Sequence, residues 1–264
     1  MKNNIEEYIN TINCMDNLEF MKQLPSNLID LIYCDIFYNT GRKYKDYNDK
    51  LGTPLDAIEW YKPRLIEMYR ILKDTGSIYL QCDYRLVHYL KVRMDYIFGF
   101  ENFRNEIIWN YDRWTNSGND FIRCHDDILR YSKTNTYIYN TQFEEFSIKS
   151  KHKGSRFSKI NNNGKLEQEY TNNKRKKAMK DVWNISILNS QAKERVGYDT
   201  QKPETLIERI IKSSSNEGDI VLDMFCGSGT TGVVAKKLNR KYILCDNNPK
   251  ACEISQERIN KINN

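Results

Sequence analysis

The 264-residue sequence contains no apolar run near the roughly 18 residues that a membrane-spanning helix requires. Its first residues include Lys and Asn and lack the apolar core of a secretory signal peptide. These two absences predict a cytoplasmic protein that has no membrane partner.

The seven cysteines lack the spacing of a metal site or a disulfide framework. No two of them form a CxxC pair, and their number is odd. Scattered thiols of this kind usually serve as small buried apolar residues in a reducing compartment. We therefore expect neither a disulfide framework nor a bound metal ion. The GxxxxGK[ST] sequence of a P-loop and internal repeats are also absent.

The composition is that of a folded globular protein, with 39% hydrophobic and 12% aromatic residues. The net charge of +6 is unevenly distributed along the chain. Residues 141–181 contain eleven Lys and Arg against five Asp and Glu, an excess that equals the charge of the whole chain. Such a segment attracts a polyanion, with nucleic acid as the first candidate, and a solvated lysine-rich loop is the alternative.

Strand and helix patterns alternate at both ends of the sequence. In the first zone, residues 1–110, we expect strands at 8–14, 28–34, 77–82 and 106–109, and helices at 56–72 and 86–98. From residue 196 onward we expect helices at 203–212, 230–238 and 250–259, and strands at 220–222 and 242–245. This alternation predicts βαβ units and a parallel sheet.

The middle of the sequence, residues 111–195, breaks this alternation. It is rich in Asn, Ser, Lys, Tyr and Trp, and the run "SKINNNGKLEQEYTNNKRKKAMK" has no apolar period. Such a run is typical of an inserted, partly mobile segment. The simplest architecture is one α/β domain made of residues 1–110 and 196–264, with a basic insertion between them.

The stretch "IVLDMFCGSGTTGVVAKKLNRKYILCDNN" carries the strongest local signal. An expected strand ends at Asp223, a loop contains Gly227 and Gly229, and a helix opens near Thr230. The next strand ends at Asp246, 19 residues after Gly227. Glycines allow a ligand close to the backbone, and an acid after the second strand can accept hydrogen bonds from ribose hydroxyls. The loop therefore predicts a cofactor that contains a nucleoside.

The loop alone does not identify that cofactor. With Gly232 it spells GxGxxG, so an oxidoreductase that binds a dinucleotide is one alternative. Against this alternative, such fingerprints usually open a fold, whereas this one lies near the end of the sequence.

Two motifs and their order resemble one known family. "LDMFCGSGTTG" is similar to the S-adenosylmethionine loop of amino-methylating DNA methyltransferases, and "CDIFYNTG" is similar to their catalytic motif, usually Asp-Pro-Pro-Tyr followed by Asn-Thr-Gly. "HDDILRYSK" and "ERVGYDTQKPETLIERII" fit the same family. The catalytic motif precedes the insertion and the cofactor loop follows it, which is the order of the β-class enzymes. The resemblance implies a circularly permuted Rossmann-like fold, with one antiparallel strand and a target-recognition region at 111–195.

The resemblance also implies the reaction. Enzymes of this family transfer a methyl group from S-adenosylmethionine to an amine of a base flipped out of double-stranded DNA. An Asp at the first motif position favours the N6 amine of adenine over the N4 amine of cytosine. Both motif prolines are absent, replaced by Ile36 and Phe37, and Met224 replaces a common proline in the cofactor loop. An N4-cytosine enzyme and a catalytically silent DNA-binding homologue are therefore the alternatives.

The catalytic residues implied by the resemblance are Asp35, Ile36, Phe37 and Tyr38. The Asp35 carboxylate and the Ile36 carbonyl would accept the two N–H bonds of the target amine and make its lone pair available. Tyr38 would stack on the flipped base, and Phe37 would add an apolar contact. Proline limits how a neighbouring carbonyl points, so the surrounding packing must take over that restraint.

The cofactor residues implied by the resemblance lie in four segments. They are Asp16, Asp35, Lys202, Pro203, Asp223, Phe225, Gly227, Gly229, Thr230, Thr231 and Asp246. Asp16 would hold the adenine end of the cofactor, and Asp246 its ribose. The "TQKP" segment would close over the methionine half, with Lys202 near its carboxylate.

DNA contacts are expected from the insertion, where basic side chains hold phosphates. The candidates are Arg113, Trp114, Arg156, Lys174, Arg175, Lys176 and Lys177. The resemblance places the protein in a prokaryotic or phage modification system, with any restriction endonuclease on a separate chain. Many members of the family form homodimers, and the sequence leaves the oligomeric state open.

Overall fold

The computed structural model describes residues 5–44, 48–113, 118–145, 156–160, 166–170 and 176–262. The chain divides into two compact units, one of Met1–Tyr139 with Asp181–Asn264 and a smaller one of Asn140–Lys180. Residues from both ends of the sequence therefore build the larger unit.

The larger unit contains an eight-stranded sheet whose order along the sheet is β1-β12-β11-β2-β3-β5-β4-β10. Its only antiparallel neighbours are β5 with β3 and β5 with β4, and the other described pairs are parallel. The fold is the expected mixed α/β fold, with one antiparallel strand. The strands are β1 (Thr11–Cys14), β2 (Ile29–Asp35), β3 (Leu72–Cys82), β4 (Phe103–Asn110), β5 (His125–Ser132), β10 (Val182–Asn184), β11 (Ile220–Asp223) and β12 (Lys241–Asp246).

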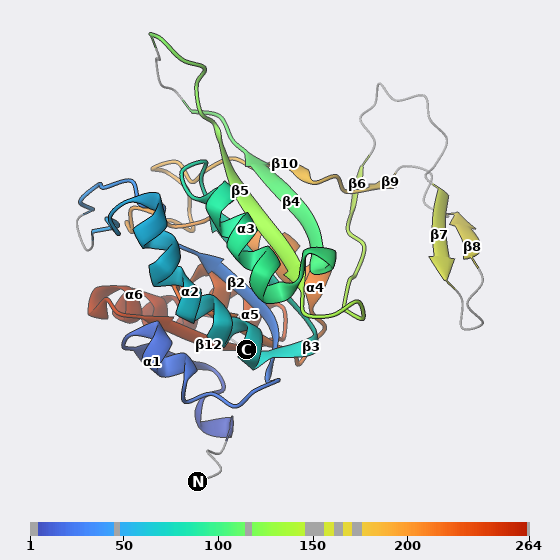
Figure 1. The fold of residues 1–264 in the computed structure, drawn as a ribbon, viewed down its shortest axis with the longest axis horizontal. Coiled ribbons are helices and arrows are strands. Elements are labelled where there is room, and N and C mark those ends of the chain that lie inside the picture. Colours follow the sequence, from blue (N-terminus) through green and yellow to red (C-terminus); the bar gives the residue numbers. More distant parts are fainter. Residues whose placement is uncertain are drawn as a thin grey trace. The chain divides into compact units, whose positions relative to one another are not determined.

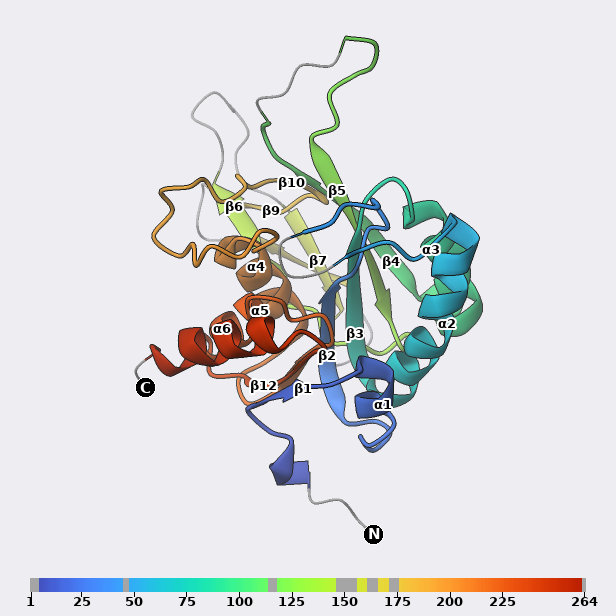
Figure 2. The same ribbon diagram turned by 90° about the vertical axis from the view of Figure 1, so that its left-hand side faces the viewer.

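Helices cover both faces of this sheet (Figures 1 and 2). One face carries α1 (Asn17–Met21), α2 (Pro54–Ile71) and α3 (Val87–Phe98). Short 3₁₀ helices at Ile5–Glu7 and Phe100–Asn102 precede β1 and β4 in the sequence. The opposite face carries α4 (Glu204–Ser214), α5 (Thr230–Lys237) and α6 (Pro249–Asn260). No helix among the described residues is long and apolar enough to cross a membrane.

Strand β2 shows how the two layers of helices make the core. Ile32 and Cys34 belong to the apolar cluster on the face of α1 to α3, whereas Leu31 and Tyr33 belong to the cluster on the face of α4 and α5. The alternation of side chains along a strand sends successive residues to opposite faces. A central parallel strand covered on both faces is apolar throughout, which explains the continuous apolar run before Asp35.

The predicted insertion at 111–195 differs from the structure at its two ends. Residues His125–Ser132 form β5 in the middle of the sheet, and Val182–Asn184 form its edge strand β10. The apolar period of β5 is interrupted by Asp126, Asp127 and Arg130, all of which are buried. Because of these charged side chains, the strand could not be recognised from its apolar pattern. Their burial becomes favourable only with partners from other parts of the chain.

The smaller unit contains two pairs of short antiparallel strands. Strand β6 (Phe143–Glu145) pairs with β9 (Lys176–Ala178), and β7 (Arg156–Ile160) pairs with β8 (Leu166–Tyr170). The run without an apolar period thus contains strands of three to five residues. The target-recognition role of this segment stays a prediction.

Candidate active site

A cleft opens at the carboxyl ends of the central parallel strands. Strands β2, β11 and β12 end at Asp35, Asp223 and Asp246, and all three acids line the cleft. In α/β sheets, ligands bind beyond the carboxyl ends of the strands. The predicted site residues that line the cleft are Asp16, Asp35, Ile36, Phe37, Tyr38, Lys202, Asp223, Phe225, Gly227, Thr230, Thr231 and Asp246.

The glycine loop between β11 and α5 uses its two glycines differently. Gly227 lines the cleft at a φ of +48°, and a Cβ there would lie 3.2 Å from a ring carbon of Tyr198. Gly229, at a φ of +74°, precedes α5 and does not line the cleft. A Cβ at Gly229 would lie 2.6 Å from Ser255 Oγ on α6. In the structure, Gly229 therefore allows two helices to pack, and its cofactor contact stays a prediction.

Asp246 is tied to the glycine loop through backbone hydrogen bonds. The Gly227 N–H donates to Asp246 Oδ2 over 2.9 Å, and the Asn248 N–H donates to Asp246 Oδ1 over 3.0 Å. Burial raises the pKa of Asp246, whereas these backbone donors lower it. Each carboxylate oxygen can accept a further hydrogen bond, so Asp246 can serve the diol of a ribose.

Asp223 organises the start of the same loop. Its carboxyl accepts hydrogen bonds from the Phe225 N–H over 3.0 Å and from Thr231 Oγ1 over 2.5 Å. Burial, with the charges of Asp35 and Asp246 nearby, raises the pKa of Asp223 to about 7. The Asp223 side chain thus stabilises the turn between β11 and α5.

Asp16 combines two functions at the edge of the cleft. Its Oδ1 accepts hydrogen bonds from the first backbone N–H groups of α1, Leu18 at 2.9 Å and Glu19 at 3.2 Å. Its Oδ2 accepts a hydrogen bond from Arg64 over 2.8 Å, and the Arg64 guanidinium lies 3.4 Å from the ring centre of Trp60. Asp16 is therefore a helix cap that also faces the cleft.

The segment that contains "TQKP" closes one side of the cleft. Thr200 and Lys202 line it, and Thr230 Oγ1 donates a hydrogen bond to the Lys202 carbonyl over 3.3 Å. Pro203 lies at the start of α4 and is not among the lining residues. Tyr198, two residues before Thr200, also lines the cleft and packs over Gly227, and it was not predicted from the sequence.

The tetrapeptide Asp35–Tyr38 begins at the last residue of β2 and is held by two backbone hydrogen bonds, one of which a proline could not make. The Ile36 N–H donates a hydrogen bond to the Gln81 carbonyl over 3.2 Å, and its side chain is only 3% exposed. Tyr61 Oη donates to the Phe37 carbonyl over 2.9 Å. A proline at position 36 would lack that N–H group. Packing and tertiary hydrogen bonds thus supply the restraint that the prolines supply elsewhere.

The side chain of Phe37 belongs to an aromatic group on one wall of the cleft. Its ring meets that of Phe225 edge to face, with 5.6 Å between the ring centres, and lies 6.2 Å from Trp60. Trp60 and Tyr61 meet edge to face at 4.9 Å. Such rings offer a flat apolar surface to a heterocyclic ligand. The sequence reasoning identified Phe37 and Phe225 but missed Trp60 and Tyr61, which lie on the helix α2.

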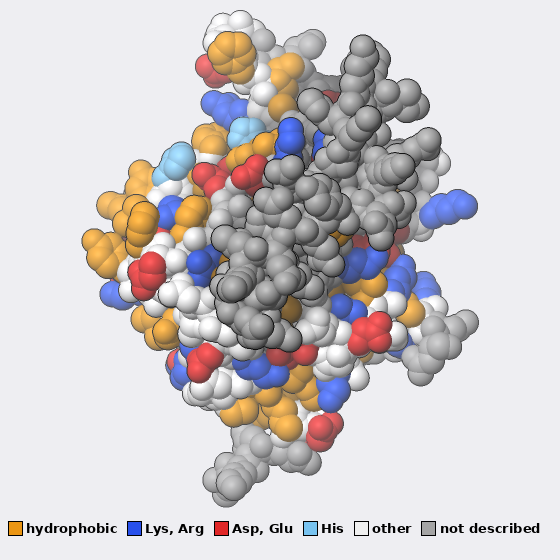
Figure 3. Space-filling view, turned by 90° about the vertical axis from the view of Figure 1, so that its right-hand side faces the viewer, with side chains coloured by type: hydrophobic (Ala, Val, Ile, Leu, Met, Phe, Trp, Pro, Cys, Tyr) orange, Lys and Arg blue, Asp and Glu red, His pale blue; other side chains and the backbone are white. Residues whose placement is uncertain are grey.

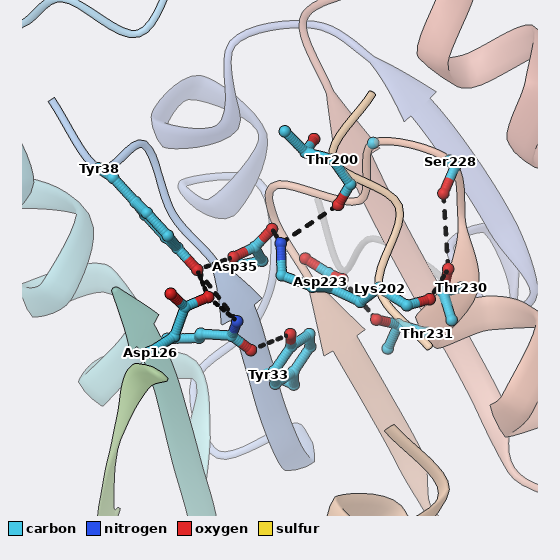
Figure 4. A network of polar contacts seen from close by, with 12 residues as sticks. Tyr33, Asp35, Tyr38, Asp126, Thr200, Lys202, Asp223, Ser228, Thr230 and Thr231 are labelled. Atoms are coloured by element: carbon cyan, nitrogen blue, oxygen red, sulfur yellow. Dashed lines mark hydrogen bonds and ion pairs between the residues drawn. The ribbon is translucent and has the colours of Figure 1, made fainter. Parts of the chain in front are cut away.

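Asp35 receives one donor on each carboxylate oxygen (Figure 4). Lys202 Nζ forms an ion pair with Oδ2 and also donates to the Thr200 carbonyl over 3.2 Å. Tyr38 Oη lies 2.8 Å from Oδ1. Burial raises the pKa of Asp35, and the charge of Lys202 lowers it. Because carboxylate oxygens hold about four lone pairs between them, Asp35 can still accept from a substrate amine.

A hydrogen-bonded network behind Asp35 was not predicted from the sequence. Tyr38 Oη also lies 2.8 Å from Asp126 Oδ2, and Gln81 Nε2 donates to both groups, over 3.0 and 3.1 Å. Tyr111 Oη donates to Asp126 Oδ1 over 2.8 Å, and Tyr33 Oη donates to Gln81 Oε1 over 2.8 Å. In the sequence, the signal for this network is the Asp pair in "HDDILRYS", which lies within the predicted insertion.

Two of the predicted DNA contacts, Arg113 and Lys177, have described side chains and belong to different units. Arg113 is exposed and donates to Tyr111 Oη over 3.1 Å, with its guanidinium 4.8 Å from the centre of that ring. Lys177 forms an ion pair with Glu144 over 3.1 Å. Trp114, Lys174 and Arg175 lie outside the described residues, and Arg156 and Lys176 belong to strands β7 and β9.

The described surface also carries charges of both signs. On the face shown in Figure 3, Lys and Arg side chains alternate with Asp, Glu and apolar ones. Of the basic residues in 141–181, the side chains of Lys177 and Lys180 are described. The DNA-binding role of the basic segment stays a prediction.

The cleft and its two motifs match a known family. A model of the N6/N4 methyltransferases, described as "DNA methylase", matches residues 29–257. The chain belongs to this DNA methylase family. The match includes the catalytic tetrapeptide, the "TQKP" segment and the glycine loop.

Curated relatives of this methylase match most of its length. It is 34% identical over 247 residues to the type II methyltransferase M.HpaI of Haemophilus parainfluenzae, covering 93% of this chain and 73% of the relative. It is 29% identical over 246 residues to the DNA adenine methyltransferase YhdJ of Escherichia coli K12, covering 92% and 80%.

Solved structures share the fold of the methylase at lower identity. The cytosine-N4-specific PvuII DNA methyltransferase matches with a TM-score of 0.67 and 18% identity, covering 96% of this chain and 88% of that one. The M1.HpyAVI–SAM complex matches with a TM-score of 0.59 and 20% identity, covering 95% and 98%. The named relatives and structures include both adenine and N4-cytosine enzymes, so the fold does not select the target base.

Proposed function

We propose that this DNA methylase transfers a methyl group from S-adenosylmethionine to the N6 amine of adenine in double-stranded DNA. The observation that carries the proposal is the placement of Asp35. Its carboxylate lies at the end of β2, is held by Lys202 and Tyr38, and faces the cleft that the glycine loop also lines. An acceptor for the substrate amine is thus placed beside a site suited to a nucleoside cofactor.

The cleft suits S-adenosylmethionine in four respects. Asp246 can accept hydrogen bonds from the hydroxyls of a ribose. The absence of a Cβ at Gly227 leaves space above the loop, which any other residue there would reduce. Phe225 and Trp60 offer aromatic faces to an adenine ring. Lys202 supplies a positive charge for a carboxylate. When bound, this cofactor supplies an electrophilic sulfonium methyl group.

The chain's own residues would activate the target amine. The lone pair of an exocyclic amine is delocalised into the ring, and two acceptors for its N–H bonds would shift the nitrogen towards tetrahedral geometry. Asp35 is one acceptor, and the Ile36 carbonyl is the other. No donor among the residues that the structure describes bonds to that carbonyl, so it is available to a substrate. This activation is positional and electrostatic.

The choice of adenine rests on the first residue of the tetrapeptide. An Asp at this position favours adenine, and the relative YhdJ is a DNA adenine methyltransferase by name. The competing reaction, N4 methylation of cytosine, would use the same acceptors, and the PvuII enzyme shows that this fold serves it. A silent homologue is the less favoured alternative because Asp35 and Ile36 both line the cleft.

Replacement of Asp35 by alanine tests the proposal. We expect Asp35→Ala to lower methyl transfer about 1,000-fold, because an amine acceptor is lost, while leaving the affinity for S-adenosylmethionine within about threefold. Transfer is measured with tritiated cofactor, and digestion of the DNA to nucleosides separates N6-methyladenine from N4-methylcytosine. Asp74→Ala, at an exposed acid of β3, is the matched control. Undiminished turnover of Asp35→Ala would refute the role assigned to Asp35. Detection of N4-methylcytosine as the product would identify cytosine, and not adenine, as the target base.

We also propose that the methylase marks one defined DNA sequence within a modification system. The relatives from Haemophilus parainfluenzae and Haemophilus influenzae are type II methyltransferases by name. Any endonuclease would then be a separate chain. Single-molecule sequencing of the source genome would reveal one methylated motif, and scattered methylation without a motif would contradict this proposal. The cytoplasmic location and a homodimer stay predictions.

A further inference from the structure

The Tyr38 hydroxyl lies between two carboxylates. Its oxygen is 2.8 Å from Asp35 Oδ1 and 2.8 Å from Asp126 Oδ2 (Figure 4). Gln81 Nε2 donates a third hydrogen bond to the same oxygen over 3.0 Å. Oxygen–oxygen contacts of this length are hydrogen bonds and need one hydrogen each.

The number of hydrogens sets the protonation of this group. A phenol supplies one hydrogen and can donate it to one carboxylate at a time. The second contact of 2.8 Å then requires a hydrogen from the other acid. If both acids were ionised, one carboxylate oxygen would face the hydroxyl oxygen without a hydrogen between them. The geometry therefore requires one proton in addition to that of the Tyr38 hydroxyl.

We propose that Asp126 is a positioning residue for methyl transfer, which shares this single proton with Asp35 through Tyr38 so that the Tyr38 hydroxyl donates to Asp35. The inference rests on the proposed function of Asp35 and holds for either target amine. Asp126 is the member that carries the proton, and Asp35 is the ionised acceptor that faces the cleft.

The partners of the two acids explain this division. Asp35 forms an ion pair with Lys202, which favours its charged form. The hydrogen-bonding partners of Asp126 are the uncharged groups of Tyr38, Gln81 and Tyr111, and its side chain is buried at 7% exposure. A buried acid surrounded by neutral donors is more easily kept neutral than one paired with a lysine.

This arrangement satisfies every group at Tyr38. The protonated Asp126 Oδ2 donates to Tyr38 Oη, which also accepts from Gln81 and donates to Asp35 Oδ1. The ring of Tyr38 is thereby fixed at its far end, and its face is preset for a flipped base. Asp126 thus supplies part of the restraint that the absent prolines would supply.

The test compares Asp126→Asn with Asp126→Ala in single-turnover methyl transfer at neutral pH. The Asn amide can donate to Tyr38 as the neutral acid does, so we expect its rate within about threefold of the native rate. Loss of the donor in Asp126→Ala should lower the rate about tenfold. Asp127→Asn, at a buried acid on the same strand, is the matched control and should keep the native rate.

A second readout needs neither cofactor nor DNA. The infrared difference spectrum between native protein and Asp126→Asn at neutral pH should contain the carbonyl band of a neutral carboxylic acid. Either an Asp126→Asn rate as low as that of Asp126→Ala or the absence of that band would overturn the proposal. If Asp126→Ala fails to fold, Asp126→Asn and the spectrum decide. Loss of transfer in Asp35→Ala would still support the proposed function in that event.

Discussion

The two halves of the cleft are held in place in different ways. In the half with the glycine loop, the restraint is local. Gly227 and Gly229 adopt positive φ angles, and the Asp223 carboxyl bonds to residues two and eight positions later. In the catalytic half, the restraint comes from distant parts of the chain. Tyr61 reaches Phe37 across 24 positions, and Asp126 reaches Tyr38 across 88 positions.

The difference predicts that the catalytic half tolerates the loss of the motif prolines. A loop defined by positive φ angles depends on glycine, since most residues with a Cβ adopt such angles only with strain. A tetrapeptide held by side chains of α2, β3 and β5 can lose its prolines and keep its position. The comparison predicts that replacing a glycine destabilises the glycine-loop half more than introducing a proline destabilises the catalytic half.

The largest expected effect is in the glycine-loop half. Gly229→Ala would place a Cβ 2.6 Å from Ser255 Oγ and 2.9 Å from Ser255 Cα at a φ of +74°. We expect the free energy of unfolding to fall by about 2–4 kcal/mol, measured by denaturant titration. Gly118→Ala is the control, because a Cβ there meets nothing within 4 Å. Equal stability of the two variants would remove the basis of the comparison.

Restoration of a proline at position 36 tests the catalytic half. Ile36→Pro removes the N–H that donates to the Gln81 carbonyl, together with a buried side chain. We expect a loss of about 2 kcal/mol in the free energy of unfolding and no gain in methyl transfer. Ile36→Val keeps the N–H and should cost about 1 kcal/mol. A more stable or faster Ile36→Pro enzyme would show that the backbone there already suits a proline.

Removal of one hydroxyl should separate catalysis from stability. Tyr61→Phe loses the hydrogen bond to the Phe37 carbonyl, and we expect methyl transfer at saturating cofactor to fall about tenfold. Tyr79→Phe loses a buried hydroxyl that contacts Ser214 Oγ over 2.7 Å, away from the cleft. Both variants should lose about 1 kcal/mol of stability, measured by thermal unfolding. An equal loss of activity in Tyr79→Phe would assign the effect to stability instead.

The smallest expected effect is a change in pH dependence. Asp35 must be ionised to accept from the amine, so activity falls as the pH drops through its pKa. Burial raises this pKa and Lys202 lowers it, so Lys202→Met should raise the pKa and move the acidic limb of kcat to higher pH. Lys202→Arg keeps the charge and should keep the limb near its native position. An unmoved limb in Lys202→Met would mean that the ion pair does not control the ionisation of Asp35.

The regular elements could be predicted because their signals are local. The helix expected at residues 86–98 is α3 at Val87–Phe98, and the strand expected at 28–34 is β2 at Ile29–Asp35. Strand β5 could not be predicted from its pattern, because Asp126, Asp127 and Arg130 interrupt the apolar period. Charged residues inside a strand become buried only when distant partners are present, and a periodic pattern cannot show those partners.

The sequence by itself determined the α/β alternation, the family resemblance and the residues at the ends of three strands, since each is written in contiguous letters. The tertiary structure alone decided what holds the proline-less tetrapeptide. Gln81, Tyr61 and Asp126 come from separate elements, and only the strand order β2-β3-β5, with α2 packed on it, brings them to Ile36, Phe37 and Tyr38. Hydrogen bonds act over about 3 Å, so a contact between residues far apart in sequence exists only once the chain has folded.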